Sequence, residues 1–531
     1  MSFAPHVSSD PDWDDLTVSD DDLHFITNLL LEREAPLTTP EMVHALVGRR
    51  LAARDEAPPL SAQDGSPAYH PAESYAVGAT LRFPVLGQRV GRVVALRDGD
   101  NPEIPGFEVI QVEFEGDGSR HEFAAGLPDH KLNRPASPPL APAREETPEA
   151  VLARSGRRLE ERLNEKLSQA KDLVRIAGRW FPRALLAEIH DGHRNLAEAV
   201  LDVAQGGPLP TRQLLEHVEL PPDMDPLLAE FSLDYALQED ERFDEVGPAG
   251  QVLWYLRRLE PPEVLLIPPR LEYEQIPHDR SALSEAARQL EADLDDELSP
   301  LESPDPPPEE VTLALLFPHW RVGALPLSSR LRPLFPTAYE SPRIRFILVD
   351  GHTGQKFPGW VVREPRYVIG LDEWFQRHQI PPGGLIRVRR GEEKGEVVVE
   401  AIDRRRRNEW IRTITADESG RIGFTMSKVA VGAAYDERMV VGLTDATALD
   451  QAWLSGPQRR SPFERLVVQI FRELAKLNPQ TAVHAQALYS GVNVVRRVPP
   501  APLLLELSQR PYFEHVGDLY WRFQESAWGR G

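Results

Sequence analysis

The chain has 531 residues, of which 50 are proline and none is cysteine, and its formal net charge at pH 7 is −23. The length predicts several domains, and the lack of cysteine excludes disulfides, thiolate metal sites, iron–sulfur clusters and a cysteine nucleophile. No apolar run reaches the roughly 18 residues of a membrane-spanning helix, and the acidic residues 1–22 are not typical of a signal peptide. We therefore expect a soluble, cytoplasmic, multidomain protein that makes no membrane contact.

Charge is distributed unevenly along the chain. Residues 1–80 hold 14 acidic and 4 basic side chains, residues 260–312 hold 15 and 3, and residues 313–531 hold 23 and 31. The first part is therefore acidic, and the last part is mildly basic. Either the acidic segments only keep the chain in solution, or they compete with nucleic acid for the basic half.

The first 260 residues alternate between helical and strand-like patterns. Apolar spacing over 20–54 predicts two helices, the second begun by Thr39-Pro40. Residues 75–132 change to short β-branched runs separated by turns, a pattern that fits a small SH3-like barrel. Residues 157–176 space leucines four apart, which predicts an amphipathic helix. Further helices are expected up to a strand at 252–256.

The remaining residues repeat this alternation. Residues 261–310 are acidic and rich in proline, which predicts a linker with one short helix. Several strands are expected between 311 and 445. Helices then follow from 461, and an aromatic strand ends the pattern near 523.

Two segments repeat each other. Residues 242–256 and 510–523 both run from a Phe and an acid through a Val-Gly turn into a strand with Leu and Trp, and each follows three helices. Three helices closed by a hairpin follow the winged helix-turn-helix plan. A third copy begins at Asp20, although its hairpin is not visible in the sequence. These segments resemble HARE-type and related winged helices found with bacterial RNA polymerase delta subunits and chromatin proteins.

The predicted fold class is therefore α+β multidomain, with winged helix-turn-helix modules interleaved with small β-barrel-like domains. The expected parts are a disordered acidic tail (1–18), a helix-turn-helix (19–56), a linker (57–74), an SH3-like small β-barrel (75–133), a linker (134–156), a helix plus winged helix (157–260), an acidic Pro-rich linker (261–310), a β-rich pseudobarrel-like domain (311–445) and a C-terminal winged helix (446–531).

Two groups of arginines are the candidate nucleic-acid contacts. Alternate residues of a strand share a face, so Arg387 and Arg389 are expected to project together, and the run that follows suits phosphate contact. Trp374 and Trp410 are candidates to stack on bases. The full predicted set is Arg387, Arg389, Arg404, Arg405, Arg406 and Arg407 in the β-rich domain, with Arg459, Arg460, Arg496 and Arg497 flanking the C-terminal helices.

The β-rich domain also carries a second resemblance. Residues 367–371 and 380–388 are similar to parts of the pseudobarrel of B3-type DNA-binding domains. The alternative is a solvated surface on which the arginines pair with neighbouring acids such as Glu396 and Glu400. In the central winged helix, the expected third helix, 223–240, is acidic, which favours a protein partner over DNA.

Catalytic motifs are scarce. The phosphate-binding, dinucleotide-binding, nucleophile-elbow and zinc-protease patterns are absent. Asp350 with Glu392-Glu393-Lys394 suggests a metal-dependent nuclease, but the Glu-Glu-Lys string is flanked by glycines and reads as a turn. His190 and His193 have metal-ligand spacing without a further ligand nearby.

We therefore expect a non-enzymatic DNA-binding protein, transcription- or nucleoid-associated, that contacts the phosphates of double-stranded DNA through its basic C-terminal half. A protein partner is expected at the acidic N-terminal half, and no cofactor or metal is expected. The alternative is a protein–protein scaffold without nucleic-acid contact, and a metal-dependent nuclease is a third hypothesis. The sequence does not determine the oligomeric state.

Overall fold

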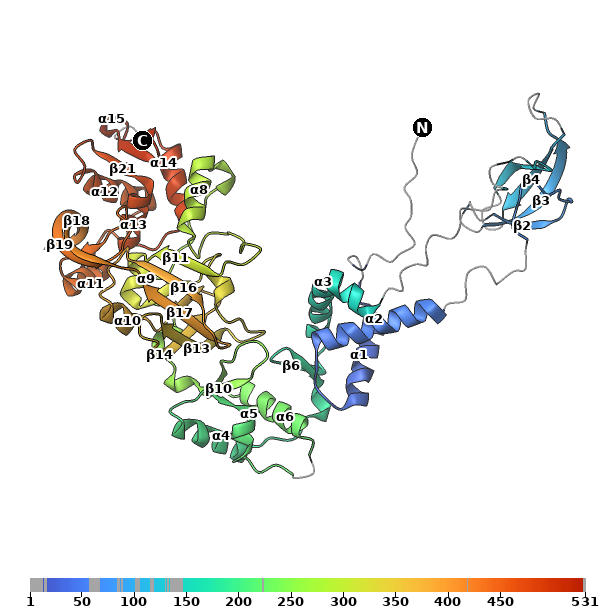
Figure 1. The fold of residues 1–531 in the computed structure, drawn as a ribbon, viewed down its shortest axis with the longest axis horizontal. Helices are drawn as coiled ribbons and strands as arrows, with labels where there is room; N and C mark the ends of the chain where they lie inside the picture. The colour runs from blue at the N-terminus through green and yellow to red at the C-terminus, as the bar shows by residue number, and fades with distance from the viewer. Residues whose placement is uncertain are drawn as a thin grey trace. The chain divides into compact units, whose positions relative to one another are not determined.

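The computed structural model describes residues 13, 17–56, 67–83, 86, 89–100, 106–114, 119–128, 130, 133, 147–221, 224–417 and 419–528. Over these residues the chain is a mixed α+β protein with several separate sheets, which confirms the α+β part of the predicted fold class (Figure 1). It divides into two compact units: Met1–Arg33 with Leu37–Lys171, and Glu34–Pro36 with Asp172–Gly531.

The helices of the first unit bury the faces that the sequence predicted. Ile26 and Leu30 are buried in the first helix, and Met42 and Leu46 are buried in the second. The third helix begins after the N-cap Thr147, nine residues before the predicted start, and packs against the second. The elements are α1 (Asp20–Arg33), β1 (Leu37–Thr38), α2 (Thr39–Glu56) and α3 (Pro148–Ser168).

The β-sheet of the first unit lies between α2 and α3 in the chain. Four strands form an antiparallel meander around a core that includes Phe83, Ile110 and Phe114: β2 (Thr80–Phe83), β3 (Arg89–Asp98), β4 (Glu108–Phe114) and β5 (Arg120–Ala125). Tyr69 stacks on Phe83 with ring centroids 4.8 Å apart, so this domain begins inside the predicted linker 57–74. Residues 57–66 and 134–146 lie outside the described residues, as do most of residues 1–18, although Trp13 is buried.

The second unit opens with a hairpin and a three-helix module. Trp254 lies at the centre of the module's core, as the sequence predicted for this strand. The sheet order is β8–β10–β9. The elements are β6 (Leu173–Ile176), β7 (Arg179–Pro182), α4 (Asp191–Val203), β8 (Leu209–Pro210), α5 (Thr211–Leu215), α6 (Pro226–Gln238), β9 (Phe243–Glu245) and β10 (Leu253–Leu256).

Residues 261–310 are not a linker. They form α7 (Pro262–Leu265) and α8 (Glu285–Leu294), and Leu283 and Leu290 belong to the core of the C-terminal module. Acidic side chains that were expected in solvent, such as Glu291 and Glu297, are buried. The composition was misleading because these acids are paired: Glu291 with Arg280 of the same segment, and Glu297 with Arg497, 200 residues away. Pairing of this kind allows burial of a charged side chain.

A seven-stranded sheet forms the β-rich domain. Its strand order is β11–β16–β17–β13–β14–β15–β12, and all neighbours are antiparallel except β13 and β17. The elements are β11 (Glu310–Ala314), α9 (Phe317–Val322), β12 (Ala324–Pro326), β13 (Arg343–Asp350), β14 (Lys356–Val362), β15 (Tyr367–Ile369), α10 (Asp372–Arg377), β16 (Leu385–Arg390) and β17 (Glu396–Ala401).

A long two-stranded ribbon follows the sheet. It consists of β18 (Asp403–Ala416) and β19 (Ile422–Ala433), and the short β20 (Gly442–Leu443) runs parallel to β18. Its side chains Ile414 and Phe424 are buried among the C-terminal helices. The ribbon therefore connects the seven-stranded sheet to the C-terminal module.

The C-terminal module repeats the element order of the central one. Its sheet, β21–β23–β22, again places the last strand in the middle. The elements are α11 (Ala446–Ser455), α12 (Phe463–Ala475), β21 (Ala482–His484), α13 (Ala485–Val495), α14 (Pro500–Gln509), β22 (Phe513–Gly517), β23 (Tyr520–Phe523) and α15 (Glu525–Trp528). Within the described residues, every helix is too short or too polar to cross a bilayer.

The third helix of this module, α14, does not face solvent. Residues Pro500–Leu507 are all buried, and α8 from the predicted linker packs against them (Figure 1). Among the basic and amide side chains that read base edges, the helix holds only Gln509, at its last position. The third helix of this module therefore presents little that could read a base edge.

Candidate functional site

The ribbon β18–β19 is held at both of its ends. At one end the Gln458 side chain accepts from the Ile422 N–H at 2.7 Å and donates to the Ile422 carbonyl at 3.2 Å. At the other end the Ala434 N–H donates to the Ile402 carbonyl at 2.7 Å, next to the seven-stranded sheet. The middle of the ribbon is therefore fixed in place while one of its faces remains exposed.

The predicted arginine run lies in a β-bulge. Asp403 pairs with Ala433, and the next pair is Arg407 with Val431, so Arg404, Arg405 and Arg406 of β18 lie opposite the single residue Gly432 of β19. A bulge bends its strand and redirects the side chains within it. Here it presents Arg405, Arg406 and Arg407 to solvent.

These arginines differ in how they are paired. Arg404 forms an ion pair with Glu409 and lies 4.3 Å from the centroid of the Tyr435 ring. Within the described part of the chain, Arg405, Arg406 and Arg407 form no ion pair. Three adjacent positive charges are thus left without a carboxylate in contact, so salt bridges within the described residues do not account for their presence.

Trp410 lies on the same strand, three residues past the arginine run. Its side chain is 64% exposed, and Lys428 stands directly opposite it on β19. Directly opposed residues of an antiparallel pair share a face, so Lys428 lies on the same face as Trp410. Asn408 lies on that face too, because it is two positions from Trp410 on the same strand. One face of the ribbon therefore combines an exposed indole with a lysine and an amide.

The first arginine group of the sequence analysis does not join this site. Arg387 donates to Glu400 at 3.1 Å within the sheet. Strand β16 starts beside Ile402 at Leu385 and runs away from the ribbon, which puts Arg389 about 13 Å further along. Arg389 is exposed but lies away from the bulge, so the structure separates the two halves of the predicted basic cluster.

The C-terminal arginines divide into three situations. Arg497 is fully buried between Asp296 and Glu297 and cannot contact a phosphate, so its prediction as a nucleic-acid contact is wrong. Arg496 is half-buried over the Phe463 ring, and burial lowers its pKa. Arg459 lies 4.0 Å from the centroid of the Trp453 ring and near Glu272. Arg460 is exposed and follows Gln458, which places it near the Ile422 end of the ribbon.

Sequence reasoning also misplaced one aromatic and missed two polar residues. Trp374 is 1% exposed and packs in the sheet domain, so it cannot stack on a base. Lys428 and Asn408 were overlooked because their position beside Trp410 depends on the register of β18 and β19. The only signal in the sequence that could have identified them was the presence of polar residues at alternate positions of the strands around Trp410.

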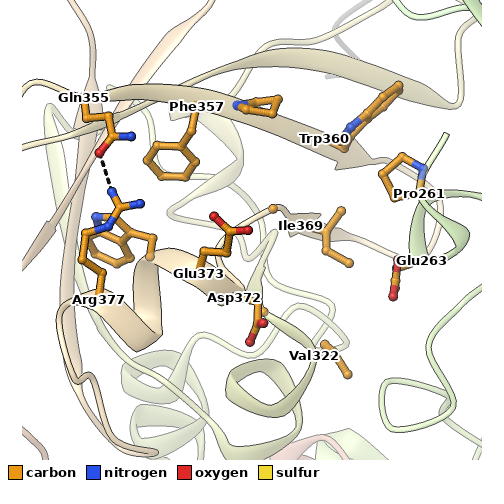
Figure 2. Close-up of a pocket in the computed structure, with 14 residues that line it drawn as sticks. Pro261, Glu263, Val322, Gln355, Phe357, Trp360, Ile369, Asp372, Glu373 and Arg377 are labelled. Carbon is orange, nitrogen blue, oxygen red and sulfur yellow. Dashed lines mark hydrogen bonds between the residues drawn. The ribbon is translucent and has the colours of Figure 1, made fainter. Parts of the chain in front are cut away.

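A separate cavity of about 430 Å³ lies at the other edge of the sheet, between α7, α9, α10 and strands β14 and β15 (Figure 2). Phe357, Trp360 and Ile369 give it apolar walls. Its charged lining residues are three carboxylates, Glu263, Asp372 and Glu373, and a single cation, Arg377, which donates to Gln355 at 2.5 Å. Three carboxylates against one guanidinium repel a phosphate, so this cavity suits a cationic group instead.

The nuclease hypothesis finds no geometric support. Asp350 is fully buried, accepts from His378 Nε2 at 2.8 Å and from the His352 N–H at 3.0 Å, and has a pKa of about 2. Burial raises that pKa, but these hydrogen bonds outweigh it. Glu392 and Lys394 lie in the turn between β16 and β17, and no group of three metal-ligating side chains forms within the described ranges.

Comparison of the chain with protein-family models, curated proteins and solved structures found no match. Its function therefore rests on the geometry described above.

Proposed function

We propose that this protein binds nucleic acid without acting on it chemically, and that the ribbon β18–β19 is the contact surface. The observation that carries the proposal is the bulge of β18 and the residue that follows it: Arg405, Arg406 and Arg407 are exposed and form no ion pair with any residue that the structure describes. Adjacent guanidinium groups repel one another, and a polyanion relieves that repulsion while releasing its own counterions. The phosphate backbone of a nucleic acid is such a ligand.

The rigidity of the ribbon supports the same conclusion. Because both ends are held by hydrogen bonds and Phe424 is anchored in a helical core, the arginines project from a fixed strand pair. Preorganised contacts lose less entropy on binding than contacts from a free loop. Arg460 adds an exposed positive charge near the Ile422 end.

The winged-helix interpretation also belongs to this proposal. In the central and C-terminal modules a helix, a short strand, two helices and a hairpin follow in order, as in a winged helix. A similar order begins in the first unit with α1, β1, α2 and α3, and the hairpin β6–β7 at the start of the second unit follows them in the chain. The four-stranded domain is inserted between α2 and α3. We propose that these modules hold the domains of the chain together and do not contact nucleic acid, because in the C-terminal module α8 covers the third helix, α14.

The test is a binding experiment with the full chain across a salt series, using fluorescein-labelled 20-nucleotide strands and the matching duplex. The triple variant R405A/R406A/R407A is expected to weaken binding at least tenfold at low salt, and to reduce the slope of log K against log salt by about two to three. The matched control R33A/R257A/R465A removes the same charge from other exposed positions and is expected to change the slope little. Equal effects of the two triples, or no binding by the native chain, would refute the proposal.

A scaffold function is the second candidate, and the cavity beside α10 favours it. The cavity is lined by apolar side chains and by the carboxylates of Glu263, Asp372 and Glu373. This lining suits a lysine or arginine of a protein partner, because the apolar stem contacts the walls and the charged head pairs with the carboxylates. In that case the triple variant E263Q/D372N/E373Q abolishes binding of a basic peptide, measured by calorimetry with a lysine-rich 10-mer, and leaves nucleic-acid binding unchanged. No heat from the native chain would count against this candidate.

A further inference from the structure

Trp410 is the exception among the tryptophans of this protein. The chain has 10 tryptophans, and the other nine are buried or half-buried. Trp410 leaves 64% of its side chain in solvent, in the middle of a strand whose neighbouring residue Ile411 is 4% exposed. A large exposed aromatic on a rigid strand is typical of a binding surface.

The surroundings of Trp410 define the kind of ligand. Lys428 stands opposite it, and Arg406, the last residue of the bulge, lies four positions before it on the same strand. Arg407, three positions away, alternates onto the other face of β18. Four residues of strand span about 13 Å, which is the length of about four nucleotides at the 3.4 Å rise of each strand in duplex DNA. An aromatic platform with cations on a track of this length matches a base with the phosphates that follow it.

The chemistry of the indole separates single strands from duplexes. Inside a duplex both faces of each base are covered by its neighbours, so an indole reaches them only by unstacking the helix. In an unpaired strand the faces are open, and stacking on aromatic side chains is the usual source of affinity. The amide of Asn408, on the same face of the ribbon, is available to hydrogen-bond a base edge.

We propose that the ribbon binds a single-stranded segment of nucleic acid, with an unpaired base stacked on Trp410 and the phosphates contacted by Lys428 and by Arg405 and Arg406 of the bulge. This inference rests on the proposed function and narrows its ligand. It differs from the sequence-based expectation, which was double-stranded DNA.

The test compares affinities of the full chain for labelled 20-nucleotide oligothymidine, oligouridine and a mixed 20-base-pair duplex. Native protein is expected to prefer the single strands. W410A is expected to weaken single-strand binding by roughly 5- to 150-fold, while W410F, which keeps a ring, retains most of it. Duplex affinity is expected to change less than twofold, and the salt slope is expected to stay the same because no charge is removed. L454A, which truncates another side chain that is 64% exposed, is the control.

The outcomes distinguish this inference from the proposed function. If R405A/R406A/R407A weakens binding while W410A has no effect, the ribbon binds phosphates but the stacking is wrong. Equal losses on duplex and single strand in W410A also overturn the inference. If the native chain binds none of the three probes at low salt, both proposals fail, and Trp410 becomes a candidate contact for a protein partner. Comparable affinity for oligothymidine and oligouridine indicates that the sugar is not read.

Discussion

Arg497 donates a hydrogen bond to Asp296 Oδ1 at 2.6 Å, although 201 residues separate them in the chain. The same guanidinium reaches Glu297 at 2.7 Å, and Glu297 also bonds His319 at 3.0 Å. Burial opposes ionisation of Glu297, but the charges of Arg497 and His319 hold its pKa well below the usual range. This cluster joins the segment before β11 to the C-terminal module.

The first prediction concerns this buried cluster. R497A leaves Asp296 and Glu297 buried without their cation, so we expect a loss of about 3–5 kcal/mol in the free energy of unfolding. The measurement is urea unfolding of the full chain, following the transition of the second unit. The control R460A removes an exposed arginine and is expected to change stability by less than about 0.5 kcal/mol.

A triple variant separates charge from packing at the same cluster. R497M/D296N/E297Q removes the cation together with both carboxylates, so no unpaired charge stays buried, and much of the stability is expected to return. A triple variant as unstable as R497A would mean that the guanidinium is needed for its shape and hydrogen bonds. Near-native stability of R497A itself would contradict the argument.

The second prediction concerns Asp234 in the central module. It is buried, accepts from Trp254 Nε1 at 2.9 Å and from the Thr211 hydroxyl, and burial raises its pKa to about 7. A raised folded pKa contributes stability that is fully present below the unfolded value near 3.8 and is lost as pH rises to about 7. The loss from this group amounts to at most about 4 kcal/mol.

D234N removes this titration and keeps an oxygen to accept both hydrogen bonds. We expect thermal stability to fall less between pH 4 and pH 7 in the variant than in the native chain, because only the contribution of Asp234 is removed. Glu245 and Glu260, whose pKa values burial raises to about 8, contribute equally in both proteins. At pH 7 the variant is expected to be at least as stable as the native chain. If D234N were clearly less stable than the native chain at pH 7, the ionised form of Asp234 would cost the native chain little free energy of unfolding, contrary to this prediction.

The third prediction has the opposite sign and concerns His484 in the C-terminal module. Burial and the charge of Arg438 lower its pKa to about 4, and its Nδ1 accepts from the Gln486 N–H at 3.1 Å. A depressed histidine pKa contributes stability that is present above pH 6.5 and is lost as pH falls to about 4. The loss amounts to at most about 3 kcal/mol.

H484Q is expected to remove this part of the acid sensitivity. The measurement is the urea midpoint of the second unit at pH 7.5 and at pH 4.5, for the native chain and the variant. The fall between the two pH values should be smaller in H484Q. If both fall equally, other groups account for the acid sensitivity.

Local patterns predicted the local structure of this protein well. Ile26, Leu30, Met42 and Leu46 form the buried faces that their spacing indicated, and the repeat around Trp254 corresponds to two modules of equal element order. These features depend on near neighbours in the chain, which the sequence displays directly.

Features that depend on distant residues were not predictable. Asp296 and Glu297 made residues 261–310 look like a solvated linker because their partner, Arg497, lies about 200 positions away. Arg497 looked like a phosphate contact for the same reason. The bulge at Arg404–Arg406 depends on the register of two strands, which composition and periodicity do not specify.

The last prediction concerns Glu409, which neutralises one member of the arginine run. Glu409 accepts from the Tyr435 hydroxyl at 2.6 Å and pairs with Arg404, and these contacts lower its pKa. E409Q leaves Arg404 without its counterion and raises the positive charge of the ribbon by one. If the ribbon binds phosphates, we expect tighter binding to labelled oligonucleotides and a salt slope steeper by about one.

The control for this experiment is Y435F, which removes the hydroxyl that bonds Glu409 and leaves every charge in place. Its salt slope should match that of the native chain, because the slope counts ions released and not hydrogen bonds within the protein. A slope in E409Q that stays at the native value would mean that Arg404 does not reach the ligand. An E409Q variant that binds more weakly would mean that the carboxylate instead holds the bulge in its binding conformation.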